Sequence, residues 1–172
     1  METVAASQGR AEGFALRDAG EADLPLLLRF VRALADYERL AHEAVATEAE
    51  FRRFLFREPR RAEALIAEAD GAPVGFAVWF YSFSTFLGRP SLYVEDVFVE
   101  PAARGRGVGR AIFRDLARRA LAAGCGRMEW SVLDWNAPSI AFYRSLGAAP
   151  RRGWTVQRLT GDALAALAQG RE

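Results

Sequence analysis

Hydrophobic residues follow two different periods along this chain, and the changes of period divide it into elements. From Glu21 to Leu40 they recur every three or four residues, which is the spacing of one face of a helix. Short apolar runs bounded by turn residues predict strands. The expected strands are Phe14–Arg17, Ala62–Ala69, Val74–Ser84, Leu92–Val99, Arg127–Leu133 and Thr155–Thr160.

Further helices and one hairpin complete the pattern. A capping box at Thr47–Glu50 begins a short helix that runs through Phe56. The dipeptide Asp70-Gly71 predicts a hairpin between the second and third strands. The remaining helices are expected over Val108–Ala122, Ala137–Leu146 and Asp162–Ala168. This order predicts a mixed α/β sheet with helices on both faces. The length, 172 residues, suits one domain, which we place at residues 13–172 behind a flexible tail of residues 1–12.

The turn between the fourth strand and the following helix carries the first chemical signal. Gly105, Gly107 and Gly109 occupy alternate positions there. Glycines allow a close backbone approach, and the unpaired N–H groups at the start of a helix attract an anion. Three arginines, Arg104, Arg106 and Arg110, add positive charge that suits a phosphate. A plain strand-to-helix turn with a solvated arginine face is an equally good interpretation of this turn alone.

The composition excludes several phosphate-binding families. All 23 basic residues are arginine, so a Walker loop, which needs a lysine, is absent. A Schiff-base lysine, and with it pyridoxal phosphate chemistry, is excluded for the same reason. The glycine spacing also differs from the G-x-G-x-x-G pattern that binds dinucleotides.

The spacing Arg104-x-x-Gly107-x-Gly109 resembles the pyrophosphate-binding signature of the GNAT superfamily of acetyl-CoA-dependent N-acetyltransferases. Leu92–Val99 is similar to the central strand of that family, and Asp134–Ala148 to its later helix. Within the superfamily, the early Leu34–Glu38 and the late Gly153-Trp154 are similar to the diamine (spermidine/spermine-type) and thialysine acetyltransferase branch. The blocks occur in the expected order.

The resemblance implies a GNAT-like fold with splayed central strands, acetyl-CoA as co-substrate and no metal. It implies an enzyme that transfers acetyl to a primary amine of a small molecule, by direct attack in a ternary complex. It also implies a homodimer. The positions that match the coenzyme site are Val97, Phe98, Val99, Arg104, Gly105, Arg106, Gly107, Val108, Gly109, Arg110, Asn136, Ser139 and Tyr143.

Two residues match the catalytic positions of the family. Tyr143 stands where the family places a tyrosine beside the coenzyme sulfur, and a phenol can protonate a departing thiolate. It could instead be a helix tyrosine that packs beside Phe142. The resemblance puts Glu95 in the amine site, as a binder or as a base acting through water. Adjacent Asp96 would point to the opposite face of a regular strand, and we expect a structural hydrogen bond for it.

The expected amine site also includes Tyr37, Glu38, Arg152 and Trp154, although a solvated helix end would equally explain the first two. The chain departs from the polyamine branch twice, because Ser82–Phe86 contains no acidic residue and an arginine precedes Gly153-Trp154. Polyamines need several carboxylates, so a smaller amine or one carrying its own carboxylate is favoured. A coenzyme-A-binding regulatory module without turnover, and an acetyltransferase of protein amines, remain alternatives.

Charge and cysteine content set the remaining expectations. The chain has 23 basic and 22 acidic residues, which gives no strong field for nucleic acid or a membrane. Its single cysteine, Cys125, suits a reducing compartment, so we expect a cytoplasmic protein. His42 has no cluster of histidines or cysteines nearby, which argues against a metal site. Cys125 likewise lacks a partner base, which argues against a cysteine acyl-enzyme.

Overall fold

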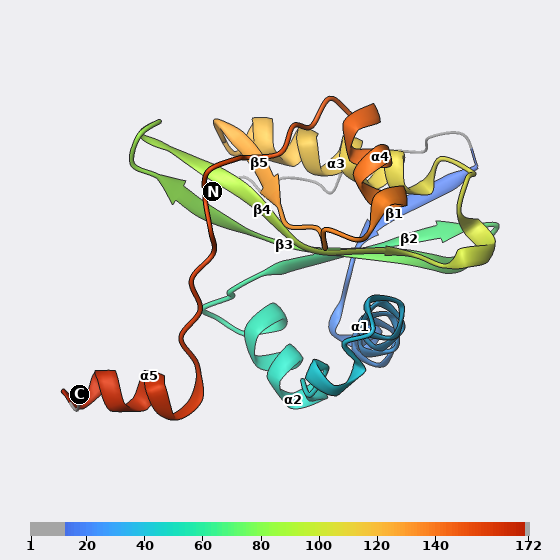
Figure 1. The fold of residues 1–172 in the computed structure, drawn as a ribbon. Coiled ribbons are helices and arrows are strands. Elements are labelled where there is room, and N and C mark those ends of the chain that lie inside the picture. Colours follow the sequence, from blue (N-terminus) through green and yellow to red (C-terminus); the bar gives the residue numbers. More distant parts are fainter. Residues whose placement is uncertain (1–12, 171–172) are drawn as a thin grey trace, which may run out of the picture. The chain divides into compact units, whose positions relative to one another are not determined.

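A computed structural model of the chain describes residues 13–170, so the expected tail, residues 1–12, lies outside the described residues. The chain forms two compact units, one ending at Trp135 and one beginning at Asn136. The first unit contains a five-stranded sheet in the order β1-β2-β3-β4-β5 (Figure 1). Its strands are β1 Phe14–Asp18, β2 Glu63–Ala69, β3 Ala72–Ser84, β4 Arg89–Val99 and β5 Arg127–Trp130.

The first four strands run antiparallel to their neighbours, and β5 runs parallel to β4. The main helices are α1 Leu24–Glu38, α2 Glu48–Phe51 and α3 Val108–Ala122 in the first unit, and α4 Ala137–Ser145 and α5 Gly161–Ala168 in the second. Short helical turns precede α1 at Glu21–Asp23 and extend α2 over Arg52–Phe56. Two further turns are Ala41–Glu43 and Pro101–Ala103.

Both faces of the sheet are covered, as the sequence predicts (Figure 1). On one face, Phe30 of α1 stacks on Phe76 with ring centroids 5.5 Å apart, and Phe98 belongs to the same cluster. On the other face, Ile112 and Leu116 of α3 are fully buried. Burial of large apolar side chains stabilises a fold by roughly 1.5–3 kcal/mol each, so these two layers fix the position of α1 and α3 on the sheet.

Several predicted elements are confirmed. Helix α3 begins and ends at the residues predicted, Val108 and Ala122. The Asp70-Gly71 turn closes the β2–β3 hairpin with φ values of 52° and 77°, which is the left-handed conformation that such turns require. The capping box is also present, because Thr47 and Glu50 exchange side-chain to backbone hydrogen bonds.

The prediction of a last strand at Thr155–Thr160 is wrong, because the described chain has no strand there and its sheet ends at β5. Threonine and valine favour a pleated strand, but a strand also needs a neighbour for its hydrogen bonds. The predicted strand Arg127–Leu133 is also shorter than expected, since β5 stops at Trp130.

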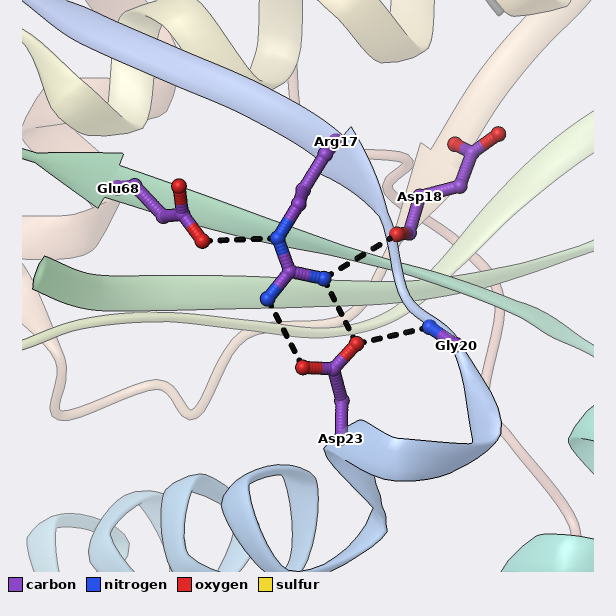
Figure 2. Close-up of polar contacts among 5 residues, drawn as sticks. All are labelled: Arg17, Asp18, Gly20, Asp23 and Glu68. Carbon is purple, nitrogen blue, oxygen red and sulfur yellow. Dashed lines mark hydrogen bonds and ion pairs between the residues drawn. The ribbon is translucent and has the colours of Figure 1, made fainter. Parts of the chain in front are cut away.

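Arg17 connects three elements of the first unit (Figure 2). Its guanidinium donates two hydrogen bonds to the carboxylate of Asp23, at 2.7 and 2.8 Å, and one to Glu68 of β2 at 2.8 Å. Asp23 also accepts the backbone N–H of Gly20 at 2.8 Å. The hydrogen bond from Arg17 is the main reason that the pKa of Asp23 lies below its ordinary value. The start of α1 is thereby attached to the edge of the sheet.

We expect Arg17→Gln to lower the free energy of unfolding at pH 7 by roughly 1–2 kcal/mol, because charge-assisted hydrogen bonds in a half-buried network are lost. Because the pKa of Asp23 is lowered, the stabilisation is present above about pH 4 and is lost as the pH falls through that pKa. Urea unfolding at pH 7 and pH 3 tests both statements. Arg57→Gln is the control, since Arg57 pairs with Glu21 from an exposed position. Equal losses in the two variants would contradict the prediction.

Candidate active site

Strand β4 contains one extra residue at the place where the sequence sets two acids side by side. Val78 of β3 pairs with Asp96, but the next residue, Trp79, pairs with Val94. Glu95 is therefore an unpaired bulge residue. Because the bulge shifts the alternation by one, Val94 and Asp96 lie on opposite faces instead of sharing one. Asp96 shares its face with Val78, in the layer covered by α1.

The pairing of β4 with β5 ends beside the bulge. The last parallel pair is Val94 with Trp130, and within residues 13–170 no strand borders the following residues, Glu95–Val99, on that side. Backbone groups along this edge can therefore bind an extended ligand, as the resemblance implies for Val97, Phe98 and Val99. The side chain of Phe98 is 5% exposed and packs in the core, so only its backbone can serve.

The turn after β4 has the geometry of an anion site. Gly105 and Gly107 have φ values of 74° and 91°, which glycine adopts without strain, whereas Gly109 lies inside α3 in ordinary helical backbone. Space is open above Gly105, because an added Cβ would meet no described heavy atom within 4 Å. In the described chain no side chain caps the start of α3, and its first turn holds no acidic residue. The N–H groups of this turn, Val108 included, suit an anion such as a pyrophosphate.

The three arginines of the turn differ in what they contact. Arg106 pairs with Asp70 of the hairpin at 3.3 Å, and Arg110 is exposed in the first turn of α3. Arg104 instead donates from Nε to the carbonyl oxygen of Val99 at 2.9 Å. Its guanidinium carbon lies 4.8 Å from the ring centre of Tyr37. The three arginines therefore make different contacts, and their role as phosphate ligands stays a prediction.

The carboxylate of Asp96 lies in the field of two other acids, Glu95 beside it on β4 and Glu38 at the end of α1, and we call these three residues the acidic cluster. The pKa of Asp96 is raised to about 6, first by burial and then by the negative charges of Glu95 and Glu38. Burial also raises the pKa of Glu38. Among residues 13–170 the carboxylate of Asp96 makes neither a hydrogen bond nor an ion pair, so the structural hydrogen bond expected for it is not found. A buried carboxylate without a cation is costly, and an ammonium group would lower that cost.

Tyr37, the residue before Glu38, packs against Trp135. The rings of Tyr37 and Trp135 are 6.1 Å apart, and the guanidinium of Arg39 lies 5.5 Å from the Trp135 ring. Tyr37 and Glu38 are thus the last two residues of a helix that packs on the sheet, and Tyr37 is half-buried instead of fully solvated.

The second unit contains the remaining predicted residues. Asn136 begins α4, and its side-chain oxygen accepts the backbone N–H of Ser139 at 3.2 Å. Tyr143 lies in the same helix with its ring 5.5 Å from that of Phe142. Arg152 and Trp154 follow in a segment without strand or helix, where Arg151 stacks on Trp154 at 4.2 Å. The N-cap role of Asn136 is confirmed, and the coenzyme and catalytic roles of this unit stay predictions.

The described residues offer neither a cysteine nucleophile nor a metal site. Cys125 is buried, and burial raises the pKa of its thiol, which disfavours the thiolate that a nucleophile needs. Within the described part of the chain, no three His, Cys, Asp or Glu side chains are placed so that they could hold a metal ion, the acidic cluster included. The same residues include no helix long and apolar enough to cross a membrane.

Sequence reasoning missed two features of this site. The bulge depends on the register between β3 and β4, which the sequence does not display. The contact of Arg104 with Tyr37 joins residues 67 positions apart, and no periodicity could have revealed it. The adjacent acids Glu95 and Asp96 in an apolar strand were the available signal for the cluster.

We expect Asp96→Asn to stabilise the fold at neutral pH by roughly 1–3 kcal/mol, because it removes the charge of a half-buried, desolvated carboxylate. The folded state holds the Asp96 proton more tightly than the unfolded state, so wild-type stability falls as pH rises from about 4 through about 6. The variant's advantage should therefore be small at pH 4 and full above pH 7. Urea unfolding across this range measures it, with the exposed Asp36→Asn as control. A pH-independent difference would contradict the prediction.

Comparisons with known proteins agree with this geometry. The family model described as "Acetyltransferase (GNAT) family" matches residues 29–148. Thialysine N-epsilon-acetyltransferase of Bos taurus is 36% identical over 164 residues, which cover 89% of this chain and 96% of the relative. L-ornithine N5-acetyltransferase of Arabidopsis thaliana is 28% identical and covers 88% of this chain and 86% of its own.

Among solved structures, an integron cassette protein from the mobile metagenome of V. cholerae has a TM-score of 0.75 at 26% identity, covering 92% of this chain and 99% of its own. The sheet and helices found here therefore match a known arrangement, and the resemblance to the thialysine branch is confirmed by the relatives above. The chain belongs to the acetyltransferase (GNAT) family and is an N-acetyltransferase.

Proposed function

We propose that this enzyme acetylates a primary amine on a small amino-acid-like molecule, with acetyl-CoA as donor and both substrates bound together. The observation that carries the proposal is the cluster formed by Glu38, Glu95 and Asp96 near the β4 bulge. Carboxylates that lack a cation provide a site for an ammonium group. Thialysine and ornithine, named as acceptors for the relatives above, are amino acids with a second amine.

The acceptor must lose a proton before it attacks, because only a neutral amine is nucleophilic. Glu95 is exposed and Asp96 is half-buried beside it, so this pair can bind the ammonium group and accept the proton directly or through water. The thioester supplies the acetyl group, so the N–C bond forms as the C–S bond breaks. Tyr143 donates a proton to the departing sulfur. The nitrogen loses its second proton after the attack, and a proton returned through solvent restores the Tyr143 hydroxyl, so groups and protons balance without an acyl-enzyme.

The coenzyme would be held mainly by backbone. The N–H groups of the Gly105–Gly109 turn and of the first residues of α3 bind the pyrophosphate, with Arg106 and Arg110 adding charge. The open edge of β4 at Val97–Val99 accepts the pantetheine arm. The resemblance adds Asn136 and Ser139 as further coenzyme ligands. The homodimer and the cytoplasmic location stay predictions.

Replacing Tyr143 by phenylalanine should lower kcat by about 100-fold or more while the Kd of acetyl-CoA changes by less than about threefold. The hydroxyl is needed as charge develops on sulfur and contributes little to ground-state binding. Steady-state kinetics and calorimetry give the two quantities. Phe142→Tyr is a control for changes in the packing of α4. A near-normal kcat in Tyr143→Phe would leave Tyr143 a packing residue.

A panel of acceptors tests the substrate class. We expect ornithine- and lysine-like amino acids to give a higher kcat/KM than spermidine or spermine, because Ser82–Phe86 carries no acid and Arg152 attracts a carboxylate. Arg152→Glu should shift the ratio towards polyamines by about tenfold, as expected for a reversed charge near the acceptor. Mass-spectrometric detection of the N-acetyl product measures each rate.

Arg158→Glu is the matched control, because Arg158 lies in the same exposed segment as Arg152 but outside the predicted site. Its acceptor ratio should stay that of the wild type. If spermidine or spermine is the best acceptor, the proposed substrate class is wrong. If the wild type acetylates none of the amines, the acceptor is a protein amine and the proposed substrate class is wrong.

A further inference from the structure

Arg104 directly precedes the proposed pyrophosphate turn, Gly105–Gly109, but its described contacts are with β4 and with α1, where the proposed amine site lies. Its Nε donates to the carbonyl oxygen of Val99, the last residue of β4, at 2.9 Å. The guanidinium carbon lies 4.8 Å from the ring centre of Tyr37 and 5.7 Å from that of Phe98. One guanidinium therefore connects the turn, the end of β4 and the last turn of α1. Arginine suits this role because its planar group donates in a fixed direction and stacks on aromatic rings.

Tyr37 lies directly before Glu38 in α1, and so it links Arg104 to the acidic cluster. Its ring lies 6.1 Å from that of Trp135, and the next residue, Glu38, is one of the charges that act on Asp96. Helix α1 ends at Glu38, and Arg39 takes a left-handed conformation with φ of 64°. The backbone N–H of Arg39 donates to the carbonyl oxygens of Ala35 and Asp36, which closes the helix locally. The ring of Tyr37, by contrast, is placed by tertiary contacts, and the one with Arg104 comes from the residue directly before the pyrophosphate turn.

We propose that Arg104 is a positioning residue that couples the occupancy of the coenzyme turn to the acceptor-amine site. An anion bound at Gly105–Gly109 fixes the turn, the fixed turn holds Arg104 against Tyr37, and Tyr37 holds Glu38 beside the bulge. Each substrate then binds more tightly when the other is present, and the coupling is equal in both directions. The inference rests on the proposed function, because it takes the acidic cluster as the amine site.

Arg106 provides the contrast. It makes a longer ion pair, 3.3 Å, with the exposed Asp70, and its carbon lies 5.7 Å from the Phe14 ring. Neither contact involves α1 or the end of β4. A bound pyrophosphate would therefore gain charge from Arg106 without any consequence for Tyr37.

Calorimetry tests the coupling directly. The Kd of coenzyme A, which cannot transfer acetyl, is measured alone and with the best acceptor of the panel at saturation. In the wild type we expect the amine to lower the Kd of coenzyme A several-fold, and in Arg104→Gln we expect the amine to leave that Kd unchanged. In separate turnover assays, Arg104→Gln should raise the KM of the amine about fivefold through loss of the stacked cation. Tyr37→Leu should act alike, and the double variant should lose no further coupling. In Arg106→Gln the Kd should rise equally with and without amine.

The proposal holds if the Arg104→Gln effect on coupling is at least fivefold larger than its effect on the Kd of coenzyme A alone, and any other outcome overturns it. In particular, a large loss of coenzyme affinity with unchanged coupling would make Arg104 a phosphate ligand. Thermal unfolding of each variant confirms the fold, and Arg104→Lys, which keeps the charge, should retain part of the coupling. Wild-type turnover on the panel is measured first, so failure of the proposed function is seen separately.

Discussion

The extra residue in β4 is the constraint on which the candidate site depends. Without Glu95 as a bulge, Asp96 would lie on the face covered by α3, away from the end of α1. The same short stretch is where β5 stops pairing, so one irregularity coincides with both an acid on the α1 side and an open strand edge. A regular strand would place Asp96 on the other face, whereas the open edge depends on where β5 ends.

The site also shows how the fold supports a group that opposes folding. Within residues 13–170 no cation pairs with Asp96, and its pKa is raised by burial and by two neighbouring acids. The surrounding layers are well packed, with Phe30, Phe76 and Phe98 in contact and Arg17 attaching α1 to the sheet. Stable packing around a strained or desolvated group is a common property of functional sites. The interpretation of the cluster as an amine site therefore agrees with its energetic cost.

Signals from neighbouring residues predict part of the fold and of the candidate site, but not the features that need a partner far along the chain. The Gly105–Gly109 turn, α3 and the Asp70-Gly71 hairpin follow from neighbouring residues, because φ preferences and capping act within a few positions. The failed strand at Thr155–Thr160 and the bulge at Glu95 depend on partners far along the chain, and propensity does not name a partner. The arginines of the turn are a second example. Their positive charge follows from the sequence alone, whereas the contact of Arg104 with Tyr37 requires the folded structure.

The state of Cys125 has a practical consequence for studying a thioester-dependent enzyme. It is the one thiol in the sequence, it is buried, and its raised pKa keeps it protonated near neutral pH. Exchange with thioesters and disulfides requires a thiolate that can be reached. The protein should therefore neither form a mixed disulfide with coenzyme A nor consume a maleimide or a disulfide dye during a kinetic run. Any sulfhydryl titrated while the fold is intact comes from the coenzyme, so colour development reports turnover without a protein background.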